Sequence, residues 1–97
     1  MDIKSLSDAF VIERCSQSID MVLRLRSQER TACANVVKNI DALGATIDTA
    51  AHHEAVNVLF RSRLRLVEVR NDLAQAIDDM NRYEGECARR GFNTRAF

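Results

Sequence analysis

The sequence predicts an all-α protein, a long antiparallel helical hairpin. The chain has 97 residues, no proline and only three glycines. Proline breaks helix interiors, and a sheet protein of this size needs more glycine and proline at its turns. Apolar residues also recur every seven residues, the spacing of a helix that packs lengthwise on another helix. A chain this short forms one domain at most, so we expect a single helical domain over residues 1–97.

The first predicted helix covers about residues 7–43. Ser5 or Ser7 can cap its start, and Asp8 suits the positive end of the helix dipole. Its apolar face comprises two series that step by seven: Ile12, Ile19, Cys33 and Ile40, interleaved with Cys15, Val22, Val36 and Leu43.

A polar layer interrupts this face, since Arg26 falls in the first series and Glu29 in the second. The helix either runs on through that layer or bends near residues 27–31, with Thr31 as the cap of a new segment. We favour a continuous or gently kinked helix, because residues 28–30 are good helix formers.

The second predicted helix covers about residues 49–90, after a turn at 44–48. Gly44 is the expected stop of the first helix, and Gly91 ends the second before a tail at 91–97. The candidate caps of the second helix are Thr46, Asp48 and Thr49. With a connection of about four residues, reflection of two equal helices pairs positions whose numbers sum to ~92. Glu29 then lies near Arg63, and we expect these two to form a buried polar layer.

The apolar arc of the second helix is wider than one partner helix covers. Its seam consists of Leu59, Leu66, Leu73 and Met80, with Phe60 and Val67 on a flank. Large side chains left in water each forgo roughly 1.5–3 kcal/mol of burial. We therefore expect a homodimeric four-helix bundle. Helices from a different protein, or a three-helix monomer, are the alternatives.

A belt of arginines is the most distinctive charged feature. It comprises Arg24, Arg26 and Arg30 on the first helix and Arg61, Arg63, Arg65 and Arg70 on the second. Because 14 basic residues balance 14 acidic ones, the whole chain has no net attraction for nucleic acid. The belt is either a local site for an acidic protein surface or a phosphate backbone, or simply a solvated surface.

The remaining reactive side chains predict no catalytic or metal site, and we expect no cofactor and no enzyme activity. His52 and His53 are adjacent and point about 100° apart on a helix, so they cannot chelate one ion. Cys15 and Cys33 fit the role of small core residues, and Cys87 is expected to be the most reactive thiol. Three widely spaced cysteines and the absence of a membrane span or signal peptide favour a reducing cytoplasm.

These features favour a non-enzymatic protein-interaction module. It would be a small helical adaptor or inhibitor that blocks or escorts a partner with an acidic or apolar surface, as chaperones, immunity proteins and phage anti-defence proteins do. The high arginine and low lysine content is typical of a GC-rich bacterial or phage genome. The alternative is a nucleic-acid-binding bundle that uses the arginine belt and the basic, aromatic tail, and the two differ in salt dependence.

Overall fold

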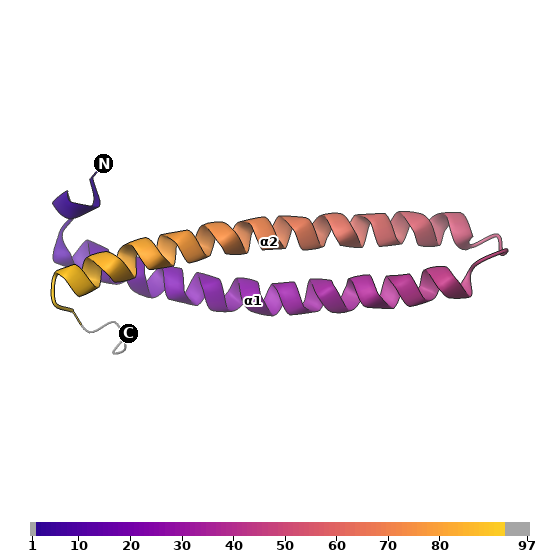
Figure 1. Ribbon diagram of the computed structural model, residues 1–97, viewed down its shortest axis with the longest axis horizontal. Helices are drawn as coiled ribbons and strands as arrows, with labels where there is room; N and C mark the ends of the chain where they lie inside the picture. The colour runs from indigo at the N-terminus through magenta and orange to yellow at the C-terminus, as the bar shows by residue number, and fades with distance from the viewer. Residues whose placement is uncertain (1, 93–97) are drawn as a thin grey trace. The chain divides into compact units, whose positions relative to one another are not determined.

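The computed structural model describes residues 2–92 and is all-helical there, with no strand in that range. A short 3-10 turn, η1 (Ile3–Ser5), precedes two long helices, α1 (Asp8–Ala45) and α2 (His52–Arg89). The chain reverses direction between the helices, which confirms the predicted antiparallel hairpin (Figure 1). None of the described helices is long and apolar enough to cross a membrane.

The outer ends of both helices are capped by local sequence. At the start of α1, the hydroxyl of Ser7 accepts a hydrogen bond from the backbone N–H of Phe10 at 3.2 Å, so Ser7 is the N-cap. At the end of α2, the N–H of Phe92 donates to the carbonyl of Cys87 at 2.9 Å and that of Gly91 to Ala88 at 3.1 Å. This pair of bonds is a Schellman motif, and it requires the positive φ of 84° that Gly91 adopts.

Helix α1 is continuous through residues 27–31, as favoured from the sequence. The hydroxyl of Thr31 donates to the carbonyl of Ser27 at 3.3 Å, a bond back along the helix instead of a cap. The helix also continues through Gly44 to Ala45, so the predicted stop at Gly44 is wrong by two residues. A lone glycine is tolerated in a helix, where it costs about 1 kcal/mol relative to alanine.

The connection between the helices is longer than predicted, because α1 ends at Ala45 and α2 begins only at His52. Asp48 has a φ of 64°, a left-handed conformation that aspartate tolerates in turns. The hydroxyl of Thr49 donates to the carbonyl of Thr46 at 2.6 Å and therefore helps to build the turn instead of capping α2.

The turn also lies later in the chain than predicted, at 46–51 instead of 44–48, and this shift changes which residues face each other. The side chains of Thr46 and His52 meet at 3.5 Å, and Arg70 Nε donates to Glu29 Oε2 at 3.4 Å. Facing positions thus sum to about 98 instead of ~92, a shift close to two turns of helix. Glu29 consequently pairs with Arg70, and the predicted Glu29–Arg63 pair is wrong.

By their internal contacts, the two helices divide into two compact units, each with its own buried residues. The terminal unit comprises Met1–Arg24 with Leu73–Phe97, and the turn unit comprises Leu25–Asp72. The buried apolar side chains of the terminal unit are Val11, Cys15, Val22, Leu73, Ala76 and Cys87. Those of the turn unit are Leu25, Ala32 and Val69.

One of the two series predicted for α1 faces the core, since Cys15 and Val22 are buried and Val36 and Leu43 are partly buried. The other series is displaced by one residue: Val11, Ser18, Leu25 and Ala32 are buried, whereas Ile40 of the predicted series is exposed. Both columns have the same seven-residue spacing, so periodicity alone does not separate them. Ser18 is accommodated because its hydroxyl donates to the carbonyl of Cys15 at 2.8 Å. Arg26 therefore does not interrupt the buried face of α1, because Leu25 occupies the corresponding position in the buried column.

Candidate interaction surface

One face of the turn unit carries most of its exposed apolar side chains. Arg70 Nη2 lies 3.7 Å from Cys33 Sγ, which places these two residues on the same side of the helix pair. Residues seven apart on a helix share a column. By helix phase, Val37 and Ile40 on α1 and Val56 on α2 lie close to this contact, and Phe60 and Val67 follow further round α2, toward its outer side. These five residues are named here the apolar face.

The apolar face is open to solvent in the single chain. Phe60 is 63% exposed and Val67 is 54% exposed, and the other three members are also exposed. These five account for half of the ten exposed large hydrophobic residues among the described positions. Exposed apolar side chains that gather in neighbouring helix columns mark an interaction site more often than scattered single residues do.

Four arginines of the predicted belt share these columns: Arg26, Arg30, Arg63 and Arg70. All four are exposed. Arg70 forms an ion pair with Glu29, whereas Arg26, Arg30 and Arg63 form no ion pair within residues 2–92. Within the turn unit, the columns that hold the apolar face contain no carboxylate, and Glu54, which lies beside Phe60, is paired with Arg61. The face is therefore both apolar and positively charged.

The opposite side of the turn unit is polar. A groove of about 200 Å³ lies there, lined by Ser27, Gln28, Thr31, Ala32, Asn35 and Arg65. Arg65 forms an ion pair with Glu68 at 3.7 Å, whereas Arg61 pairs with Glu54 at 3.0 Å beside Phe60, with which both share a second groove. The predicted belt is thus divided, because Arg65 lies on the polar side and Arg24 belongs to the terminal unit.

The other predicted site residues lie at varied depths. In α2, Leu73 is buried and Leu59, Leu66 and Met80 are partly buried. Phe60 and Val67, which were grouped with this seam, belong instead to the exposed apolar face. The predicted buried polar layer is not formed, because Arg63 is exposed and the Glu29 side chain keeps 32% of its surface in solvent.

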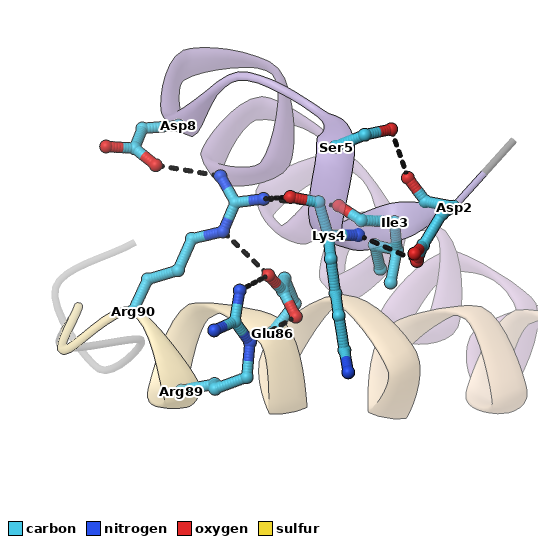
Figure 2. Close-up of polar contacts among 8 residues, drawn as sticks. All are labelled: Asp2, Ile3, Lys4, Ser5, Asp8, Glu86, Arg89 and Arg90. Atoms are coloured by element: carbon cyan, nitrogen blue, oxygen red, sulfur yellow. Dashed lines mark hydrogen bonds and ion pairs between the residues drawn. The ribbon is translucent and has the colours of Figure 1, made fainter.

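The terminal unit contains a network of charged side chains that the sequence analysis did not identify. Arg90, which directly follows α2, donates to Glu86 at 2.7 Å, to Asp8 on α1 at 2.7 Å, and to the carbonyls of Ile3 and Lys4 (Figure 2). The Arg90 side chain is only 10% exposed. It therefore ties η1 and the start of α1 to the end of α2. The sequence signal that could have indicated this network is the presence of acidic residues such as Asp8, Glu84 and Glu86 in both terminal segments.

Glu86 is the most perturbed carboxylate in this network. It is buried, and it also accepts a hydrogen bond from Arg89 Nε at 3.0 Å. Hydrogen bonds from Arg89 and then Arg90 lower the pKa of Glu86 from 4.5 to about 2. A carboxylate held ionised and fully paired in this way is suited to fixing structure. A general acid or base needs a pKa near the working pH.

The cysteines and histidines lie apart from the apolar face, except for Cys33 at its edge. Cys87 is fully buried, so the expectation that it is the most reactive thiol is wrong. Gly91 and Phe92 form the C-terminal cap of α2 next to Cys87. The sequence analysis instead assigned both residues to a tail that does not cover this thiol. In the described range, no group of three or more histidine, cysteine or acidic side chains gathers closely enough to hold a metal ion. Residues 93–97 of the predicted tail lie outside the described residues.

Comparison with known proteins adds no further indication. No protein-family model, curated protein or solved structure shows a significant match to this chain. Functional inference therefore depends on the chemistry of the surfaces described above.

Proposed function

We propose that this chain is a non-enzymatic protein-interaction module, a small adaptor or inhibitor that binds another protein through the apolar face. The observation that supports the proposal is the exposure of Val37, Ile40, Val56, Phe60 and Val67 within the turn unit. An exposed aromatic side chain such as Phe60 is a usual anchor of a protein interface.

The charge of the apolar face indicates the chemistry of the partner. Arg26, Arg30 and Arg63 need carboxylates when a partner removes their water, because a buried unpaired charge is costly. The columns of the face supply none. A second copy of the same chain, docked face to face, would bring arginines together without carboxylates. We therefore propose a different protein that presents apolar side chains bordered by aspartate or glutamate.

A matched pair of variants tests the proposal. Phe60→Ser removes the aromatic anchor, and Leu23→Ser is the control, because Leu23 is also 63% exposed but lies in the terminal unit. The immobilised full chain captures proteins from a bacterial extract, and each captured protein is then purified and titrated against both variants. We expect Phe60→Ser to weaken the affinity at least tenfold, which corresponds to about 1.4 kcal/mol of binding free energy, and Leu23→Ser to leave the affinity unchanged.

Several outcomes would overturn the proposal. Equal loss in both variants would show that the apolar face is not the site. Light scattering that gives a dimer mass for the wild type and a monomer for Phe60→Ser would show that a second copy occupies the face, as the sequence analysis expected. The proposal would also be contradicted if the binding of every captured protein were independent of Phe60.

Nucleic-acid binding is the second candidate, because Arg26, Arg30 and Arg63 carry positive charge that no described carboxylate pairs with. Fluorescence anisotropy with a short duplex DNA and a short duplex RNA tests it at low and high salt. Binding that weakens steeply with salt, falls in Arg30→Gln and Arg63→Gln, and is unaffected by Phe60→Ser would favour this candidate over the first.

A further inference from the structure

The deepest part of the terminal unit contains two cysteines from opposite ends of the chain. Cys15 on α1 and Cys87 on α2 are both fully buried, and together with Val11 they form the centre of one apolar cluster. Leu6, Ile19, Tyr83 and Phe92 pack around that cluster. The antiparallel pairing of the helices thus brings together two thiols that are far apart in sequence.

The two thiols share one buried environment. Cys15 and Cys87 belong to the same apolar cluster, and the chain holds both cysteines in the free form. The third cysteine, Cys33, belongs to the turn unit, where its sulfur accepts a hydrogen bond from Arg70. Each unit therefore has a distinct thiol environment, and within the described residues the terminal unit holds two buried thiols in one cluster.

We infer that Cys15 and Cys87 form a dithiol site at which a small-molecule disulfide, such as oxidised glutathione, closes an intrachain disulfide bond. The inference is independent of the proposed function. One cysteine thiolate attacks the small disulfide, which gives a mixed disulfide and releases one glutathione thiolate. The second cysteine thiolate then attacks the protein sulfur of the mixed disulfide and releases the second glutathione. Overall, two thiols lose two protons and two electrons, and the oxidised glutathione is reduced to two thiols.

The surrounding structure controls the rate of this reaction. Burial, followed by the proximity of Cys87, raises the pKa of Cys15 to about 12, so the thiolate that must attack is scarce in the closed unit. Cys87 also lies under the Schellman motif, where Phe92 both bonds its carbonyl and packs on its cluster. Oxidation therefore requires the end of α2 to open, after which reclosing brings the two sulfurs together.

The bond would connect α1 to α2 within the terminal unit. It would close a loop over residues 15–87, which restricts the unfolded chain strongly and stabilises the folded one. A reducing environment would keep the site as a dithiol, and an oxidising one would convert it to a covalent link. The site is thus a modification site whose product holds the two ends of the chain together.

The experiment uses the full chain incubated under native conditions with oxidised glutathione. Intact-mass and peptide-mapping spectrometry then identify the product, and thermal unfolding measures its stability. We expect the wild type and Cys33→Ser to lose two hydrogens and to form a Cys15–Cys87 link. Both products should unfold at a higher temperature than the reduced chain and should revert with dithiothreitol. Cys15→Ser and Cys87→Ser should form no such link.

A cap variant tests the gating. Phe92→Ala should speed formation of the link several-fold, because it removes the side chain that covers the cluster, whereas Phe60→Ala in the turn unit should leave the rate unchanged. Three results would overturn the inference: a product in Cys33→Ser that stops at a mixed disulfide with glutathione, a link between two chains only, or two free thiols that persist after the reduced protein has been cycled through thermal unfolding with the oxidant present.

Discussion

Two valines that lie two residues apart on α2 provide a direct measurement of burial in the turn unit. Val69 is 1% exposed, whereas Val67 on the apolar face is 54% exposed. Val69→Ala removes two buried methyl groups at about 0.8 kcal/mol each and leaves a small cavity, so we expect a loss of roughly 2 kcal/mol in the free energy of unfolding. Val67→Ala should change it by less than about 0.5 kcal/mol.

The comparison isolates burial because both substitutions change helix propensity equally. Urea unfolding followed by far-ultraviolet circular dichroism measures both variants, and a 2 kcal/mol difference corresponds to roughly 8–16 °C in melting temperature. Equal costs would refute the assignment of Val69 to the core and of Val67 to solvent. A cost for Val67→Ala that grows with protein concentration would instead reveal a second copy covering the apolar face.

Three further predictions concern individual contacts. A double-mutant cycle with Glu29→Gln and Arg70→Gln should give a coupling of about 0.2–1 kcal/mol in urea unfolding, as expected for a largely solvent-exposed pair. Gly91→Ala should destabilise the fold by about 1 kcal/mol and so lower the melting temperature, because alanine would have to adopt the positive φ of Gly91. Gly85→Ala inside α2 should raise the melting temperature, because alanine favours a helix more than glycine does. Neither added methyl group meets another atom, so these backbone effects decide the outcome. Glu86→Gln should lower the stability of the protein at neutral pH and should make that stability less dependent on pH in acid. The pKa of Glu86 is lowered to about 2 in the folded chain, so the stabilisation by the ionised carboxylate is lost as the pH falls from about 4.5 to 2.

Each of these predictions has a result that contradicts it. The same cycle can be made with Glu29 and Arg63. A larger coupling for that pair than for Glu29 and Arg70 would favour the helix register predicted from the sequence. Gly91→Ala without loss of stability would show that the Schellman motif does not form. A Glu86→Gln variant whose melting temperature falls in acid as steeply as that of the wild type would assign the acid sensitivity to other carboxylates.

The local features of the fold followed directly from sequence. Ser7 caps α1 and Gly91 ends α2 as expected, because capping depends on hydrogen bonds within a few residues of each end. The choice of a continuous α1 was also right, since residues 28–30 favour the helix whatever packs on it. The width of the apolar arc of α2 correctly singled out Phe60 and Val67 as side chains that one partner helix leaves uncovered.

The candidate site was predictable only in part. The arginine belt was read as one ring, but helix phase separates Arg63 on the apolar face from Arg65 on the polar side. The series of α1 through Cys15 and Val22 was predicted correctly, but the other series was placed one residue too late, because Ser18 and Ala32 are weakly apolar and hydropathy gives them little weight. Their small size suits the close approach of two helices, which is a property of the pair and not of either sequence segment.

The sequence by itself determined that there are two long helices, where their outer ends lie and that α2 has more apolar surface than one helix covers. These properties arise from hydrogen bonds and side-chain periodicity within single segments. Only the tertiary structure decided that Glu29 pairs with Arg70, that Cys87 is buried beside Cys15, and that one face of the turn unit is both apolar and basic. Those outcomes depend on the length of the turn and on the fit between helices, since each added turn residue shifts every facing pair along the hairpin.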